Sequence, residues 1–516
     1  MSRTIEVQGA ILYRRAALWP GGALFRVVPY NEAVKRVGYA IQVQFPVTTF
    51  FVQNFGCRAT QADAALIESQ LVSAGYVHSE SLDTAGVVVL NTCTVTAAAD
   101  KQARQAVREI QRDNPEARII VTGCYAQRAP EEVGALPGVT WVVGNAHQME
   151  IAGLISGVPG LLGPEPDETV AAWPTPPATS GFFPVSELQD SGGRKLASAA
   201  KILTSDLSGK MQSPGGMPLA MAESAVGGRT RATLKIQDGC DHHCAYCIIP
   251  SVRGRSQSAL PNDVIHRVST LAETGYREIV LSGINLGSYG QDLSPRTNLC
   301  DLLTRLLGET PVDQLRLSSI EPVDVTEELI DMFAQSDRLA RHFHMPLQSG
   351  SDRILRAMHR WYRTEQYARR VEYLHEAMPD AAIGADVIAG FPGETEADHC
   401  ATLEFISKLP FGYLHVFAYS ARPGTQAAQL AGHVAPNVVR QRAKDLRALA
   451  EEKRRNFVEG QAGKAVRVLT LETAGEGWRE AISGNYQRVR VAGQWLRNVW
   501  LIAVPTTGSL ALGKLY

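Results

Sequence analysis

The sequence predicts an α/β multidomain protein with an N-terminal doubly wound parallel α/β domain, a central partial barrel of six strand–helix units and a C-terminal small β-barrel. Three observations support this fold class. The 516 residues exceed what one compact core holds. Strand-sized apolar runs alternate with helical segments in two separate stretches, and short strands punctuated by Gly follow the second stretch. Hydrophobic residues at 45% and charged residues at 20% are typical of globular proteins.

The N-terminal domain is expected over residues 48–157. Helical segments are TQADAALIESQLVSAG and a run beginning near Ala97, and the strand-like runs are TTFFVQN, GVVVLN, ARIIVTG and TWVVGN. Strands that alternate with helices predict a parallel sheet.

Two segments carry no sustained period. Residues 1–47 have an apolar run that breaks at Trp19-Pro20-Gly21-Gly22, which is unlike a signal peptide, so we expect a disordered extension or a wrongly assigned start. Residues 158–228 are rich in Pro, Gly, Ser and Ala, which indicates a linker or insertion. No apolar run reaches the roughly 18 residues of a membrane span, so a soluble, cytoplasmic protein is expected.

The central domain is expected over residues 229–455. Its helical segments repeat apolar residues at three- and four-residue spacing, and its six strands are ATLKIQDG, EIVLSGI, QLRLSSIE, HFHMPLQ, AIGADVIAG and YLHVFAYS. Six such units in a row predict an open parallel barrel with its functional residues at the C-terminal strand ends.

The C-terminal domain is expected over residues 456–516, after the basic helix VVRQRAKDLRALAEEKRRN. Its predicted strands are AVRVLTLE, NYQRVRVA and NVWLIAV, which suit a small β-barrel. From Pro436 onward 14 Lys and Arg stand against 7 Asp and Glu, so this end is the candidate surface for a polyanion. A solvated helix face with balanced charges is the alternative.

Aromatic and basic residues in the last domain have two interpretations. Tyr486, Arg488 and Arg490 have the types that stack on a base or contact phosphate, but such aromatics also fill small barrels. Trp495 and Trp500 are expected in the core.

Cys240, Cys244 and Cys247 lie on one loop directly after the first strand of the central domain. Three thiolates bind a four-iron cluster and leave one iron open to an external chelator, a place that the amino and carboxylate groups of S-adenosylmethionine can fill. A structural zinc site completed by His242 or His243 is the alternative, although structural zinc usually has two separated ligand pairs.

A second cysteine set follows the strands of the N-terminal domain. Cys57, Cys93 and Cys124 come after its first, second and third strands. Successive strand ends of a parallel sheet meet at one edge, so a second three-thiolate cluster is favoured over three isolated buried cysteines. Two open clusters suggest that one generates a radical and the other holds or delivers sulfur. Cys300 and Cys400 lie in or beside helical segments and are expected in the core.

The C-x-x-x-C-x-x-C loop resembles that of the radical S-adenosylmethionine superfamily, and residues 48–516 resemble the methylthiotransferases, whose last domain is a TRAM barrel. The segments NTCTVTAAADKQARQAVR, VTGCYAQ and HVFAYSARPGTQA look like the branch that acts on N6-threonylcarbamoyladenosine. By this resemblance Cys57, Cys93 and Cys124 bind the auxiliary cluster, and the three cysteines of the central loop bind the radical cluster. Thr60 departs from the family, which often has Asn there.

The resemblance also suggests cofactor contacts at the strand ends. Segments SGINLGSYG and GADVIAGFPGE approach S-adenosylmethionine in the superfamily, which makes Gly283, Asn285 and Gly390 candidates, with ordinary strand-end turns as the alternative. The polar candidates at the rim of the barrel are Glu321, Gln348 and Ser349, of which Glu321 is either a cofactor contact or a satisfied rim carboxylate.

The implied reaction is methylthiolation at C2 of N6-threonylcarbamoyladenosine in the tRNA anticodon loop, which gives 2-methylthio-N6-threonylcarbamoyladenosine. It uses two [4Fe-4S] clusters, S-adenosylmethionine as radical source and methyl donor, a sulfur donor and an external electron donor such as flavodoxin or ferredoxin. An unpaired loop adenine enters a pocket without melting a duplex. The alternatives are isopentenyladenosine tRNA or a ribosomal protein as substrate, and a noncatalytic RNA-binding iron–sulfur sensor, which would not need the open iron site and cofactor loops.

Overall fold

The computed structural model describes residues 48–56, 58–156, 200–207, 217, 219 and 230–506, together with three short strands nearer the N-terminus. Those strands are β1 (Thr4–Ile5), β2 (Phe25–Pro29) and β3 (Tyr39–Val43), which form an antiparallel sheet in the order β1-β3-β2. The remainder of the predicted extension 1–47 lies outside the described residues, as do Cys57 and most of the predicted linker 158–228.

The N-terminal domain is a parallel sheet of six strands in the order β5-β4-β6-β7-β8-β9, as predicted in type. The strands are β4 (Thr49–Asn54), β5 (Val77–His78), β6 (Val87–Thr92), β7 (Arg118–Gly123), β8 (Val139–Val143) and β9 (Lys201–Leu203). The helices are α1 (Arg58–Ser73), α2 (Ala97–Asp113), α3 (Cys124–Arg128), α4 (Pro130–Gly134) and α5 (Ile151–Ser156), with 3-10 turns η1 (Leu82–Thr84) and η2 (Asn145–Glu150). Apolar clusters cover both faces of the sheet, which explains the unbroken apolar run of β6.

Strand β9 lies inside the segment that the sequence predicts as a linker. It pairs in parallel with β8 through Trp141↔Lys201, Val142↔Ile202 and Val143↔Leu203. The chain therefore returns to the edge of the N-terminal sheet before it enters the central domain.

The central domain has the six parallel strands that the sequence predicts. They form two sheets, β10-β13-β14 and β15-β16-β17, which isolated bridges such as Leu315↔Leu339 and Ser319↔His344 join. The strands are β10 (Ala232–Lys235), β13 (Glu278–Ser282), β14 (Gln314–Leu317), β15 (His342–His344), β16 (Ala382–Ala389) and β17 (Tyr413–Ala418). The result is a partial barrel with one large apolar core between strands and helices.

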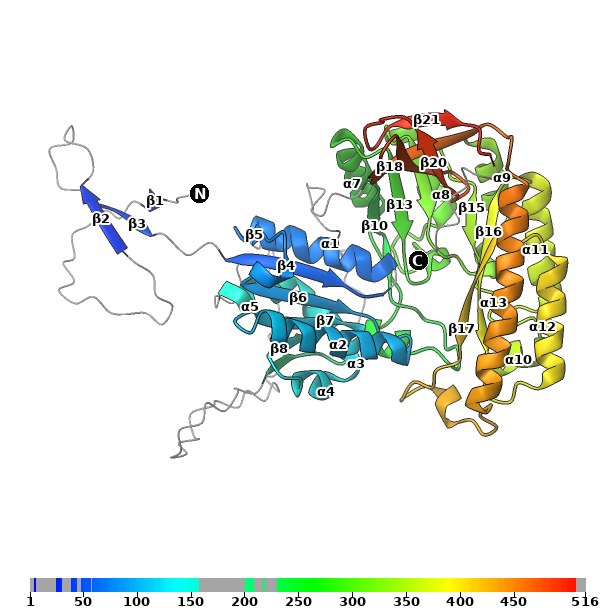
Figure 1. The fold of residues 1–516 in the computed structure, drawn as a ribbon, viewed down its shortest axis with the longest axis horizontal. Coiled ribbons are helices and arrows are strands. Elements are labelled where there is room, and N and C mark those ends of the chain that lie inside the picture. The colour runs from blue at the N-terminus through cyan, green and yellow to red at the C-terminus, as the bar shows by residue number, and fades with distance from the viewer. Residues whose placement is uncertain are drawn as a thin grey trace.

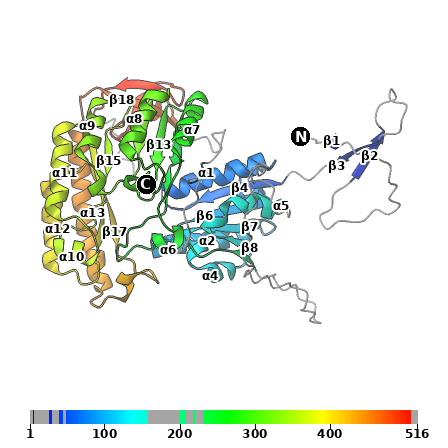
Figure 2. The ribbon, with the colours of Figure 1, turned by 180° about the vertical axis from the view of Figure 1, so that it is seen from behind.

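Helices follow the barrel strands in turn and lie outside them (Figures 1 and 2). They are α7 (Pro261–Glu273), α8 (Leu299–Glu309), α9 (Glu327–Gln335), α10 (Asp352–Ala357), α11 (Thr364–Ala377) and α12 (Glu396–Lys408), with 3-10 turns η3 (Leu286–Ser288), η4 (Pro322–Asp324) and η5 (Gln426–Gln429). The cysteine loop adds the short hairpin partners β11 (Gln237–Asp238) and β12 (Gln257–Ser258) and the helix α6 (Ile249–Arg253).

The basic segment forms α13 (Pro436–Glu459), which packs along β17 and β16. After it comes a four-stranded antiparallel sheet in the order β20-β19-β18-β21. Its strands are β18 (Val466–Gly475), β19 (Trp478–Ser483), β20 (Arg488–Ala492) and β21 (Trp500–Ala503). The sequence predicts three of them and misses β19, whose run WREAIS is largely polar.

The C-terminal sheet is seated at the amino ends of the barrel strands (Figure 1). Asn498 donates a hydrogen bond to the carbonyl of Gly275, just before β13, and Asn485 donates one to the carbonyl of Asp380, just before β16. The opposite, carboxyl ends of the strands are left for the cysteine loop. No helix in the described part of the chain is long and apolar enough to cross a bilayer.

Candidate functional site

The three-cysteine loop is held by its own backbone. Cys247 donates its amide hydrogen to the carbonyl of Cys244 at 3.0 Å, and Cys240 begins the loop after Gly239, whose φ is +68°. A Cβ on Gly239 would lie 1.9 Å from the carbonyl oxygen of Arg255. Only glycine fits at this turn, so the start of the loop is fixed by sterics.

Burial dominates the electrostatics of the three thiols. It raises the pKa of Cys240 and of Cys247 to about 12, and it raises the pKa of Cys244 as well. The guanidinium of Arg360 opposes this at Cys244, since its Nη1 donates to Sγ at 3.2 Å. Thiolates in such a place require a compensating positive charge, which iron supplies on binding.

The three thiols of the loop are not gathered around a single point in this structure. Among the described residues they do not form a group whose ligand atoms all lie within 4.8 Å of one another. Two thiolates on one tetrahedral zinc ion stand about 3.8 Å apart. His242, one of the two residues considered as a fourth zinc ligand, packs edge-on against Trp361 with ring centroids 4.0 Å apart.

Glu321 is a satisfied rim carboxylate in this structure, which is one of its two predicted roles. Its Oε2 pairs with Nη2 of Arg360, the same side chain that contacts Cys244. Burial raises the pKa of Glu321, and the Arg360 charge opposes that rise. Arg360 thus links the rim of the barrel to the cysteine loop, a role that the sequence analysis missed because no local pattern marks it.

Asn285 and Gly283 lie beside the cysteine loop at the carboxyl end of β13. The amide of Asn285 donates to Gln237 Oε1 at 2.8 Å, and its Nδ2 lies 3.5 Å from Nε2 of His242. Its Oδ1 is buried without a hydrogen-bond partner in the described structure, as a contact to a ligand amino group would require. A Cβ on Gly283 would lie 2.9 Å from Gln237 Oε1, so the absence of a side chain at Gly283 makes room for Gln237.

Gly390 and Gln348 sit at the carboxyl ends of β16 and β15. Both have left-handed backbones, with φ of +80° and +65°. Gly390 donates its amide to Glu394 Oε2 at 2.8 Å, and a Cβ there would lie 2.5 Å from Val439 Cγ2 of α13. The non-glycine Gln348 in this region is strained, as residues at functional sites often are.

Ser349 is turned toward α12. Its hydroxyl lies 3.4 Å from that of Thr402 and accepts from the amide of Ser351 at 3.2 Å. It is 1% exposed, and these two hydrogen-bonding contacts support the loop around Gln348.

Cys93 and Cys124 are both buried at the carboxyl edge of the N-terminal sheet, after β6 and β7. Cys57 lies outside the described residues, but its neighbour Gly56 has a φ of +126° and stands against Cys93. A Cβ on Gly56 would lie 2.4 Å from Cβ and 3.2 Å from Sγ of Cys93. The chain just before Cys57 therefore reaches the second cysteine, as the strand order predicts.

Cys124 also contacts the central domain. It packs in an apolar cluster with Ile248 and Val252, which directly follow Cys247. Asn145 bridges the same place, since its Nδ2 donates to the carbonyl of Val252 at 2.6 Å and lies 3.8 Å from Cys124 Sγ. Cys124 of the N-terminal set thus lies against the segment that follows Cys247 of the central set.

Buried ion pairs fix that interface on two sides. On one side Asp63 of α1 pairs with Lys235 at 2.5 Å and with Arg253 at 2.6 Å. On the other, Asp100 of α2 pairs with Arg422, which follows β17. Sequence reasoning missed these pairs because their members are more than 150 residues apart.

The aromatic predictions for the C-terminal domain are partly wrong. Tyr486 stacks on His342 with ring centroids 4.6 Å apart and lies 5.2 Å from the Arg316 guanidinium, so it fills the junction with the barrel. Trp495 is 43% exposed, contrary to the expected core position. The exposed Arg488 pairs with Glu480 at 3.2 Å.

Two family models match the chain. One, described as "Uncharacterized protein family UPF0004", matches residues 49–144, and the other, described as "Radical SAM superfamily", matches residues 234–406.

Curated relatives cover most of the chain. The "Threonylcarbamoyladenosine tRNA methylthiotransferase MtaB" of Aquifex aeolicus is 34% identical over 81% of this chain and 92% of its own, and that of Bacillus subtilis is 35% identical over 86% and 90%. The "tRNA-2-methylthio-N(6)-dimethylallyladenosine synthase" of Acidothermus cellulolyticus is 32% identical over 84% and 79%.

A solved structure shows the same fold. The radical S-adenosylmethionine methyltransferase TsrM from Kitasatospora setae, with cobalamin and a [4Fe-4S] cluster bound, has a TM-score of 0.50 at 16% identity and covers 74% of this chain and 77% of its own.

Proposed function

Because the chain belongs to the radical S-adenosylmethionine methylthiotransferase family, which uses two [4Fe-4S] clusters and S-adenosylmethionine, we propose that it methylthiolates C2 of N6-threonylcarbamoyladenosine in the tRNA anticodon loop. The product is 2-methylthio-N6-threonylcarbamoyladenosine. The observation that carries the proposal is the contact of Cys124 with the segment directly after Cys247. A sulfur-donating centre and a radical-generating centre are useful together only where both reach one substrate atom.

We assign the six cysteines to two centres. Cys240, Cys244 and Cys247 hold the radical cluster, and Cys57, Cys93 and Cys124 hold the auxiliary cluster. When bound, these groups supply a 5′-deoxyadenosyl radical, the inserted sulfur and the methyl group. The residues of the chain bind and orient these groups and shield the radical.

Two neighbouring residues prepare the radical centre. Arg360 places a positive charge and an N–H donor on Cys244 Sγ, which favours the thiolate that iron needs. Asn285 offers its buried Oδ1 to an amino group of the cofactor. An external one-electron donor such as flavodoxin or ferredoxin and a sulfur donor complete the reaction.

The choice of substrate rests on the relatives. Two relatives named for threonylcarbamoyladenosine, from Aquifex aeolicus and Bacillus subtilis, are 34% and 35% identical and are covered over 92% and 90% of their length, and two others of that name are 32% identical and covered over 86%. The dimethylallyladenosine relative from Acidothermus cellulolyticus is 32% identical and covered over 79%. The margin is small, so tRNA carrying the isopentenyl-type adenosine is the second candidate substrate.

The test is a reaction of the anaerobically reconstituted protein with two tRNA preparations, one carrying N6-threonylcarbamoyladenosine and one carrying N6-isopentenyladenosine. Nucleosides from digested tRNA are separated by chromatography, and their masses are measured by mass spectrometry. We expect the methylthio mass increase on the first and none on the second. The reverse result would assign the second substrate, and no increase on either would refute the proposal. Cys93→Ala is the matched inactive control.

A further inference from the structure

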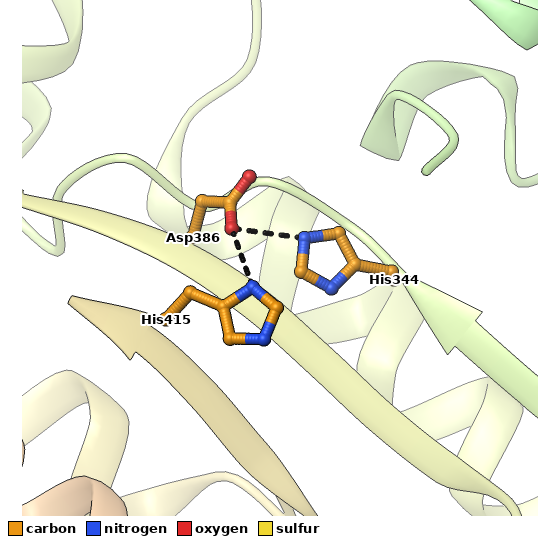
Figure 3. Close-up of side chains that lie close together, drawn as sticks. All are labelled: His344, Asp386 and His415. Carbon is orange, nitrogen blue, oxygen red and sulfur yellow. Dashed lines mark ion pairs between the residues drawn. The ribbon is translucent and has the colours of Figure 1, made fainter. Parts of the chain in front are cut away.

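Three metal-ligating side chains, none of them a cysteine, meet on neighbouring barrel strands. His344 is the last residue of β15, Asp386 lies in β16 and His415 lies in β17 (Figure 3). Asp386 and His415 are direct partners in the parallel register. His344 pairs with Gly384, the residue two positions before Asp386.

The alternation of side chains along the strands places this group on the inner face of the barrel. Phe343, Ala385 and Val387 belong to the apolar core that the helices cover. Neighbouring residues of a strand point to opposite faces, so His344 and Asp386 face the inside. The side chains of His415 and Asp386 are 37% and 24% exposed, so a solute reaches them from solvent.

The ligand atoms have the separations of a coordination shell. His344 Nε2 lies 3.0 Å and His415 Nδ1 lies 3.3 Å from the same oxygen, Oδ1 of Asp386, and all the ligand atoms lie within 4.8 Å of one another. Nitrogen and oxygen ligands about 2.1 Å from a zinc ion stand roughly 3.0–3.4 Å apart. Little movement is needed to close these three around one ion.

The charge of the group favours a cation. Asp386 supplies a carboxylate oxygen that faces one ring nitrogen of each histidine. With neutral imidazoles the group carries one negative charge. An anion would need both rings protonated, whereas a metal ion uses the neutral rings as they are.

A hydrogen bond to Tyr413 orients the buried ring of His344. Nδ1 of His344 lies 2.9 Å from the hydroxyl of Tyr413, which also lies 2.8 Å from Nε2 of His342. A metal-ligating histidine commonly has its other ring nitrogen held by such a partner. This contact leaves Nε2 of His344 pointing to Asp386 (Figure 3).

We propose that His344, Asp386 and His415 bind one divalent transition-metal ion of the zinc and ferrous class. Two imidazoles and one carboxylate suit such ions, and three protein ligands leave coordination positions for water or for an oxygen or nitrogen donor of a bound substrate. This inference goes beyond the proposed methylthiolation and does not depend on its substrate.

Zinc is the probe, and the holoenzyme is the sample. Protein with both iron–sulfur centres loaded is dialysed anaerobically against a series of buffered free Zn²⁺ concentrations, and iron and zinc per chain are measured by mass spectrometry. His415→Gln keeps a hydrogen-bonding amide near Asp386 but is a poor ligand, and the exposed His266→Gln is the matched control.

We expect wild type and the His266 variant to hold one zinc more per chain than the His415 variant, whose affinity falls at least about 10-fold, with equal iron in all three. Asp386→Asn, which keeps the side-chain shape, should give the same loss. The proposal is overturned if the His415 and Asp386 variants bind zinc as wild type does, or if wild type binds none beyond its iron.

Discussion

Gly56→Ala tests whether the N-terminal edge is built to hold a cluster. The added Cβ would lie 2.4 Å from Cβ of the buried Cys93, where ordinary contact begins near 3.4 Å, so one side must move about 1 Å. The backbone adds strain, because the φ of +126° disfavours any side chain.

The two costs have different consequences. Overpacking costs about 1–3 kcal/mol and the strained backbone costs about 1–3 kcal/mol. More important is the displacement of about 1 Å, because metal–ligand distances tolerate only about 0.2 Å. We therefore expect the auxiliary centre to be lost while the radical centre, on the other domain, remains.

The assay counts iron and separates the two activities. Wild type should hold about eight irons and Gly56→Ala about four. The variant should still form 5′-deoxyadenosine with dithionite as reductant, but it should make no methylthiolated nucleoside.

Gly75→Ala is the matched control. Its φ is +88° and a Cβ there meets nothing within 4 Å, so it carries the backbone strain of about 1–2 kcal/mol without the clash. It should keep all its iron and its product. If Gly56→Ala kept eight irons and normal product, the inferred contact at Cys93 would be wrong.

Cys244→Ala should leave about four irons and abolish 5′-deoxyadenosine, because no electron then reaches a bound cofactor; an iron count of about eight would contradict it. Cys93→Ala should keep cofactor cleavage and lose sulfur insertion, measured by chromatography of 5′-deoxyadenosine and of tRNA nucleosides, and continued product formation would refute this division. Arg316→Met should destabilise the chain by about 3–5 kcal/mol in urea unfolding, since it removes the close ion pair at 2.8 Å to the buried Glu278 and the donors to Ser483 and Gly484. A loss under about 1 kcal/mol would show that Arg231, the other cation paired with Glu278, is enough to compensate the buried carboxylate.

The strands with clear apolar runs could be predicted from the sequence, and the short or polar ones could not. All six barrel strands and β4, β6, β7 and β8 are where the sequence predicts them. β9 has three residues, too few to show a period, and β19 is held by its neighbours β18 and β20 and not by its own composition.

The sites follow the same rule. Spacing alone singles out the loop of Cys240 because its three cysteines are close in sequence, and strand phase predicts the edge at Cys93. Arg360 comes more than 110 residues after the cysteine it contacts, and no periodicity indicates such a partner. Tyr486 is the converse case. Its residue type and sequence neighbours suit a base-stacking role, but in the fold its ring stacks on His342.

The buried ion pairs between the domains bear on why the two centres can cooperate. Asp63 and Arg253 are nearly inaccessible, as are Asp100 and Arg422, and Lys235 is partly buried. Such pairs add little net stability, because desolvation offsets the attraction, but they penalise any arrangement that separates the partners by leaving a charge buried and alone. The ion pairs of Asp63 lie beside the Cys240 loop. In the other pair, Asp100 follows Cys93 by a few residues. They therefore act on the relative position of the two cysteine sets more than on the stability of either domain, and the proposed reaction, in which two centres serve one substrate atom, needs that constraint.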